Sequence, residues 1–225
     1  MKKHILKGLL VAGLFLSSAQ INKTYAQFDF ENLSFGGNLG YTGWASLGSN
    51  LAFGVRGHYV SNEKLAVVVS YNTQIPVTSD TYDAYAQANS SLVTPSQVSV
   101  EVKDKVSFHQ VAVEGNYYFV GDLEENFGLY GLAGVGLVFA SVSSEVGDYD
   151  KSKYNLGSEY SETQAYTGLL MNGGIGANFM LSDQISIFGE AKIGIPANRV
   201  NEQAVVNPIP FNYGFGVGVR FNPFN

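Results

Sequence analysis

The chain has 225 residues, of which 45% are hydrophobic and 14% charged, and it contains 26 glycines, 15 phenylalanines and 14 tyrosines but no cysteine. This composition argues against a cytosolic enzyme, which carries about 25% charged residues. It also excludes a disulfide framework, a thiolate metal site and a cysteine nucleophile. Without residues 1–26, which hold four basic residues and no acid, the net charge of −6 becomes −10, so we expect no nucleic-acid partner.

Residues 1–26 have the form of a cleaved signal peptide. Three lysines precede a short apolar core at 8–16, and a polar stretch then ends on a small residue, Ala26. We predict cleavage after Ala26, with Ala19 as the weaker choice, which leaves 27–225 as the mature chain. The alternative of an N-terminal membrane anchor is disfavoured because the apolar core is too short to cross a bilayer as a helix.

The rest of the chain alternates with a period of two. In residues 211–221 every odd position is Phe, Tyr or Val, and every even position is Asn, Gly or Arg. Successive side chains of a β-strand point to opposite faces, so this strand has one apolar face and one small or polar face. Seven further segments share the pattern, near 33–41, 51–59, 65–72, 111–119, 127–139, 169–181 and 185–195.

These eight segments can cross a membrane as tilted strands, which need about 9–11 residues. Short connections alternate with longer ones, as in outer-membrane barrels. The short ones are 61–64, 121–126 and 182–184; the longer ones are 78–98, 143–163 and an intermediate 197–209, while 46–50 is short and breaks the pattern. We predict an all-β fold, an antiparallel up-and-down transmembrane β-barrel of about eight strands. A soluble β-sandwich is disfavoured because the second face is rich in glycine rather than in Lys and Glu.

Charged residues at inward positions are predicted to lie in the barrel lumen. By parity they are Arg56, His58, Glu114, Glu190, Lys192 and Arg220. Buried charges are costly unless paired, so we predict a salt-bridge network centred on Glu114 and Glu190, with Arg56, Lys192 and Arg220 as their partners. We favour a network that fills and stiffens the barrel; the alternative is a gated path for protons or small solutes.

Aromatic residues gather near the strand ends served by the short turns, where we predict an interfacial girdle. They are Phe35, Tyr59, Tyr117, Phe119, Phe127, Phe179 and Phe221.

The segment 98–108 reverses the pattern, because its even positions are valines while Glu101, Lys103 and Lys105 are odd. We interpret it as the fourth strand extending above the membrane, with a β-bulge near His109. The alternative is a separate hairpin strand within the loop.

No catalytic motif, cofactor fingerprint or metal-ligand pattern occurs, so we expect no catalytic residue, cofactor or metal. The best candidate for a Ser-His-acid site is His109 with Ser107 or Glu114, although a single histidine on a strand is usually structural.

The loops 78–98 and 143–163 are acidic and contain Tyr, Ser and Asn. They are either solvated surface or the binding site of an extracellular partner.

The segment ending Tyr25-Ala26-Gln27, the strands of alternating Gly and aromatic residues, and the closing run from Gly216 to Phe224 resemble the small outer-membrane β-barrel family, often called porin-family or OmpA/OmpX-like barrels, in a Bacteroidota-type member. The resemblance implies location in the outer membrane of a Gram-negative bacterium, contact with its lipid, and assembly by the barrel-assembly machinery. That machinery reads a terminal aromatic, here Phe221 or Phe224. Some relatives add a peptidoglycan-binding domain; we expect none here.

Three functional hypotheses remain. The first is a non-enzymatic integral outer-membrane barrel with a structural or surface-interaction role and a lumen plugged by charged side chains. The second is a narrow porin-like channel or a transporter of small or apolar solutes. The third is an outer-membrane lipid-modifying enzyme. Eight strands leave no aqueous channel by default, which favours the first.

Overall fold

The computed structural model describes residues 32–45, 47–122, 125–160, 163–197 and 209–223. The predicted signal peptide 1–26, the first residues of the mature chain, most of the connection 197–209 and Phe224 lie outside these ranges. The chain from Glu31 onward forms one compact unit.

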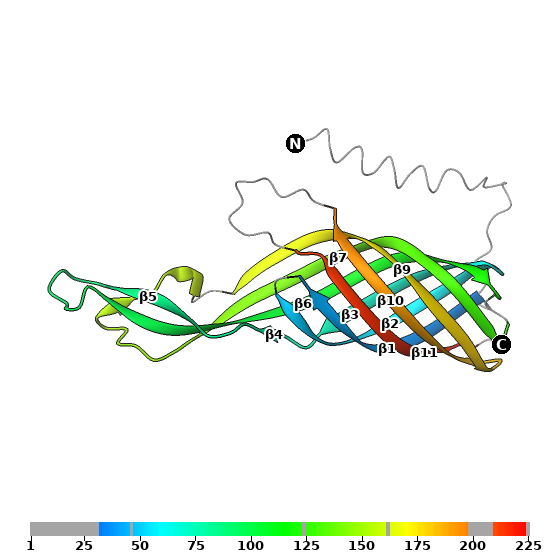
Figure 1. The fold of residues 1–225 in the computed structure, drawn as a ribbon, viewed down its shortest axis with the longest axis horizontal. Coiled ribbons are helices and arrows are strands. Elements are labelled where there is room, and N and C mark those ends of the chain that lie inside the picture. Colours follow the sequence, from blue (N-terminus) through cyan, green and yellow to red (C-terminus); the bar gives the residue numbers. More distant parts are fainter. Residues whose placement is uncertain (1–31, 46, 123–124, 161–162, 198–208, 224–225) are drawn as a thin grey trace, which may run out of the picture. The chain divides into compact units, whose positions relative to one another are not determined.

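Eight antiparallel strands of the described chain form a closed ring (Figure 1). They are β1 (Leu33–Trp44), β2 (Gly48–Asn62), β3 (Leu65–Gln74), β6 (Gln97–Val120), β7 (Phe127–Val146), β9 (Gln164–Ser182), β10 (Ile185–Pro196) and β11 (Asn212–Phe221). In the order given, each of these eight strands pairs with the next one, and β1 pairs with β11 to close the ring. The predicted barrel and its eight strands are therefore confirmed.

The strands are staggered by ten residues around the ring. Moving from Ser34 to its paired residue on each successive strand leads through Glu114 and Asn172 back to β1 at Trp44, ten residues further on (44 − 34 = 10). With a rise of ~3.3 Å per residue and strands ~4.8 Å apart, this stagger tilts the strands by about 40° from the barrel axis. The interior of such a barrel is narrow enough for side chains to fill.

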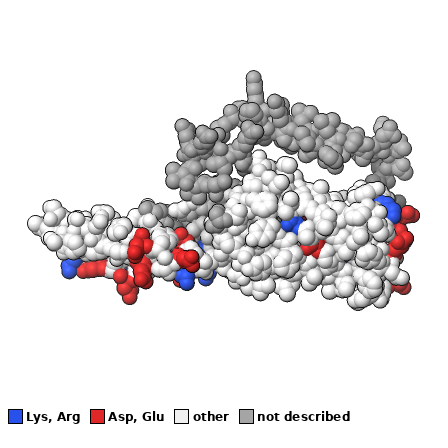
Figure 2. All heavy atoms as spheres, in the orientation of Figure 1, with Lys and Arg blue, Asp and Glu red and all other residues white. Residues whose placement is uncertain are grey.

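The two faces of the barrel wall differ in chemistry. Outward side chains are apolar and exposed, for example Val55 at 62%, Ile175 at 65% and Val217 at 66%, whereas inward Ser70 and Asn116 are buried. On the face drawn in Figure 2 the wall is uncharged apart from one basic and one acidic spot. Such an apolar belt is typical of a wall that contacts lipid. In the described ranges, no helix is long and apolar enough to span a bilayer.

Strand β6 has no bulge at His109, where the apolar pattern of the sequence changes. Odd residues of β6 face outward and even residues inward from Gln97 to Phe119. The register with β7 is continuous across residue 109 and shifts only between Tyr118 and Val120, whereas the pairing with β3 ends at His109. The predicted bulge is therefore wrong, whereas the prediction that this strand extends beyond the barrel is confirmed. What reverses is the polarity: above His109 the outward residues include Lys105 and the inward ones include Val106, because water replaces lipid outside.

Beyond the barrel, β6 and β7 continue into an extension that Figure 1 shows projecting from one end. It includes β5 (Tyr82–Ala88), β8 (Tyr154–Asn155) and the short 3-10 turn η2 (Ser158–Tyr160), with β4 (Val77–Thr78) paired to β6. The regions 78–98 and 143–163, expected as loops, thus contain strands. The extension has its own buried core of Ala84, Ala86, Val100, Val102, Tyr154 and Leu156. We call this end of the barrel the extension end and the opposite one the turn end.

We expect Val100→Asp to unfold the extension and leave the barrel folded. Val100 is 2% exposed, and burying an unpaired carboxylate costs on the order of several kcal/mol. Limited proteolysis with mass spectrometry should show new cleavage between residues 79 and 105, with unchanged migration of the unheated barrel on a gel. Gln97→Asp, at an exposed position of the same strand, should remain resistant. Equal cleavage of both variants would show that this core does not hold the extension.

Candidate functional site: the lumen of the barrel

An ion pair crosses the middle of the lumen. Arg56 on β2 donates two hydrogen bonds to Glu190 on β10, from Nη1 to Oε1 at 2.7 Å and from Nη2 to Oε2 at 3.0 Å. The two side chains are 3% and 4% exposed. Since β1 and β11 separate β2 from β10 in the ring, this bidentate pair ties non-adjacent strands together.

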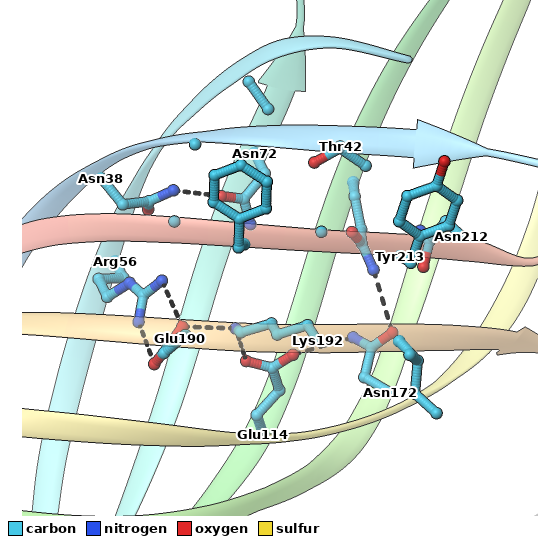
Figure 3. Close-up of a pocket in the computed structure, with 17 residues that line it drawn as sticks. Asn38, Thr42, Arg56, Asn72, Glu114, Asn172, Glu190, Lys192, Asn212 and Tyr213 are labelled. Carbon is cyan, nitrogen blue, oxygen red and sulfur yellow. Dashed lines mark hydrogen bonds and ion pairs between the residues drawn. The ribbon is translucent and has the colours of Figure 1, made fainter. Parts of the chain in front are cut away.

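Lys192 joins this pair to the second acid. Its Nζ lies 3.1 Å from Oε2 of Glu190 and 2.6 Å from Oε2 of Glu114 on β6. Asn172 donates from Nδ2 to the other oxygen of Glu114 at 3.0 Å and accepts a hydrogen bond from Gln110 at 3.3 Å. Figure 3 shows the labelled side chains of this group meeting inside the barrel. We call Arg56, Glu190, Lys192 and Glu114 the ionic network.

The ionic network contains four of the six charged residues predicted for the lumen. Arg220 is buried in the lumen but forms no ion pair with any described residue; its guanidinium group hydrogen-bonds the Tyr118 hydroxyl. The expected pairing of Arg220 with a glutamate is therefore wrong. His58 is also buried, with its ring 6.2 Å from that of Phe188. The functional importance of these six residues stays a prediction.

Two inward tyrosines extend the ionic network toward the turn end. Tyr130 donates a hydrogen bond to Glu190 at 2.8 Å, and its ring lies 4.9 Å from that of Tyr118. Gly176 makes room for Tyr130, because a Cβ at this position would overlap the tyrosine ring. Sequence reasoning missed these two tyrosines. The available signal was their even position, opposite to the odd, outward aromatics of β6 and β7.

A polar cavity of about 90 Å³ lies on the extension side of the ionic network. It is lined by the four residues of the ionic network, by amide and hydroxyl side chains, and by residues of β10 and β11 that include Ile193, Tyr213 and Phe215. The Lys192 side chain is 25% exposed. The amide and hydroxyl residues are Asn38, Thr42, Asn72, Gln110, Asn172 and Asn212. The cavity has room for a few water molecules.

An apolar layer closes the lumen beyond this cavity. Trp44 stacks on Phe108 with ring centroids 4.1 Å apart, and Trp44 Nε1 donates to Gln74 at 2.6 Å. Trp44 is the next inward residue after Thr42 on β1, and Phe108 is the next inward residue before Gln110 on β6. Both therefore directly adjoin residues that line the cavity. Val106, Val138, Ala140, Leu170 and Ile209 complete the layer. This layer was not predicted, because only the inward charges were considered, although Trp44 stands at an inward position.

The seven predicted girdle residues lie at the turn end. The register pairs Phe35 with Phe221 and Phe127 with Phe179. Six of the seven are 45–60% exposed, and Tyr59 is half-buried. Their role at the membrane interface stays a prediction, as does the role of Phe221 as an assembly signal.

His109 does not form a catalytic group with Ser107 or Glu114. Its Nδ1 lies 2.8 Å from the Tyr71 hydroxyl and 3.1 Å from the Thr73 hydroxyl, on the outer face. Glu114 instead faces the lumen, because 109 and 114 differ by an odd number of residues along one strand. Within the described part of the chain no hydrogen bond joins His109 to Ser107, and no cluster of potential metal ligands occurs. This candidate catalytic set is therefore wrong.

The fold is similar to that of solved outer-membrane proteins at low sequence identity. Neisserial surface protein A is 14% identical, over 84% of this chain and 95% of that one, with a TM-score of 0.50. A major outer membrane protein from Thermus thermophilus is 12% identical, over 84% and 99%, with a TM-score of 0.52. No protein-family model matches the sequence, and no curated protein matches it. At these identities the similarity concerns the fold.

Proposed function

Because this chain has the fold of the small outer-membrane β-barrels, we propose that it is a non-enzymatic outer-membrane protein of a Gram-negative bacterium, with a closed lumen and a structural or surface-interaction role. The apolar belt would contact lipid. The short turns would face the periplasm and the extension would face the outside, as is usual for such barrels.

The stacking of closed layers in the lumen carries this proposal. The ionic network is cross-linked between β2, β6 and β10, and the apolar layer of Trp44 and Phe108 covers the cavity above it. A hydrated solute would have to break buried ion pairs and then pass an apolar constriction. Both barriers favour a barrel that does not conduct solutes and instead anchors the extension in the membrane.

We expect the purified mature chain, residues 27–225, to give no discrete openings in planar bilayers. The ion pairs and the apolar layer would both block ions, so the current should equal that of the protein-free bilayer. Heat-modifiable migration on a gel would verify that the reconstituted chain is folded. Reproducible single-channel steps from folded protein would contradict the closed lumen.

A narrow channel is the second candidate, and the polar cavity beside Lys192 is the observation that favours it. A cavity lined by amides could form part of a water path if the apolar layer moved. In that case the same recordings should show small, cation- or anion-selective steps, and exchange of Lys192 for Met should change the selectivity.

The extension supports the surface-interaction part of the proposal. Tyr85 is 59% exposed and Leu92, near the hairpin tip, is 91% exposed. The Tyr82 hydroxyl donates a hydrogen bond to Asp104 at 3.0 Å, and partial burial together with this bond raises the pKa of Tyr82 to about 12. Rigid presentation of tyrosines suits contact with an extracellular partner.

We further propose that the barrel-assembly machinery reads Phe221 at the end of β11.

A further inference from the structure

A second group of buried polar side chains lies between the ionic network and the turn end. Arg220, Ser186 and His58 are 8%, 3% and 4% exposed. Ser186 on β10 is the cross-strand partner of Arg220, whose partner on β1 is Gly36, and Gly36 in turn faces Arg56. His58 follows Arg56 as the next inward residue of β2. Gly36 is the inward residue of β1 between Arg220 and Arg56, and a Cβ at this position would come within 3.5 Å of both residues.

Several buried polar atoms of these and neighbouring residues have no protein partner. Ser186 Oγ, His58 Nε2 and Arg56 Nε form no hydrogen bond with any described residue, and neither does Asn178 Nδ2 on β9. Each of these four atoms can donate a hydrogen bond. Two buried acceptors are also unpartnered, Asn116 Oδ1 on β6 and Asn38 Oδ1 on β1, so donors outnumber acceptors by four to two among these atoms. Buried polar atoms in native proteins are bonded to protein, water or an ion, and a cluster of donors suits an acceptor.

Among the described residues of the lumen, the charges leave an excess of one positive charge. Arg56, Lys192 and Arg220 face Glu114 and Glu190, so with neutral His58 the sum is +1 (3 − 2 = 1). Both acids are engaged by Arg56 and Lys192, which places the excess at Arg220. A buried cation without a counter-charge is costly.

We propose that this group binds a small inorganic anion such as chloride. Arg220 supplies the charge, and the Ser186 hydroxyl and the His58 Nε2–H supply further hydrogen bonds. The anion neutralises the lumen and satisfies donors that the protein leaves unpaired. It is an internal ligand of the folded barrel, so the proposal does not depend on whether the barrel conducts or binds a partner.

The test compares chloride with gluconate, an anion too large for a buried site among these side chains. The folded mature chain in detergent micelles is heated at equal ionic strength in either sodium salt, and unfolding is followed by the fluorescence of Trp44, the single tryptophan. We expect the unfolding midpoint to rise with chloride concentration but not with gluconate. Bromide should replace chloride and give an anomalous scattering peak beside Arg220 in crystals.

Three variants complete the test. Arg220→Met should abolish the difference between the salts, and Ser186→Ala should weaken chloride binding about tenfold by removing one donor. Lys64→Met removes one positive charge from an exposed turn residue and should retain the full chloride effect. If Arg220→Met does not fold, the Ser186→Ala variant and the bromide peak in crystals still test whether an anion binds beside Arg220. An absent chloride effect in the unmodified chain, or an equal effect in Arg220→Met, would overturn the proposal in favour of water.

Discussion

Replacing Glu190 with alanine is expected to lower the free energy of unfolding of the barrel by about 3–5 kcal/mol, because removing one partner leaves buried charges uncompensated. Glu190 binds Arg56 through both oxygens, lies 3.1 Å from Lys192 Nζ and accepts a hydrogen bond from Tyr130. No other acid is within ion-pair distance of Arg56 in the described chain. Urea unfolding in micelles, with gel migration after graded heating, would measure the loss.

The double variant Arg56→Met with Glu190→Met is the matched control. It removes both members of the pair and leaves side chains that can pack, so it should lose less stability than Glu190→Ala. If Glu190→Ala unfolds at the same urea concentration and temperature as the unmodified chain, the ionic network does not stabilise the barrel.

Replacing Phe108 with alanine is expected to cost about 3 kcal/mol and to admit water to the apolar layer. Phe108 is 2% exposed and stacks on Trp44 at 4.1 Å. Since Trp44 is the single tryptophan of the chain, its emission reports on this layer directly. The emission maximum should shift to longer wavelength, and an aqueous quencher should gain access to the indole.

Phe139→Ala provides the comparison for this change. Phe139 faces outward and is 42% exposed, and it is the cross-strand partner of His109, the residue next to Phe108. The same truncation there should leave Trp44 emission unchanged. An unshifted spectrum in Phe108→Ala, or equal shifts in both variants, would mean that the layer does not seal the lumen.

The fold was predictable because its main signal is local. Alternation with a period of two needs no knowledge of distant residues, and β11 shows it in ten consecutive positions from Asn212 to Phe221. The same parity assigned Arg56, Glu114 and Glu190 to the inside, where the structure has them. Strand number and the face of each residue therefore follow from sequence.

Partners across the lumen were not predictable, because they depend on the stagger of the ring. Parity says that Arg220 faces inward but not how high it lies relative to Glu190. The ten-residue stagger puts Tyr118 within reach of Arg220 and leaves both glutamates to Arg56 and Lys192. Stagger is a property of the closed ring and leaves no mark in any single strand.

The predicted bulge at His109 failed for a different reason. A change of apolar parity was taken as a change of backbone, whereas β6 keeps one register and changes its surroundings. Inside the bilayer the apolar face is the outer one, and outside it the apolar face is the inner one. The reversal marks where the solvent changes along a continuous strand.

The pairing of β1 with β11 joins the first and last strands of the ring. Until Phe221 is available, β1 and the newest strand each present a row of free N–H and C=O groups. In hydrocarbon each such group costs several kcal/mol. A chain interrupted before its last strand therefore has no stable half-inserted resting state, and membrane entry and closure of the seam must occur together or behind a protective surface.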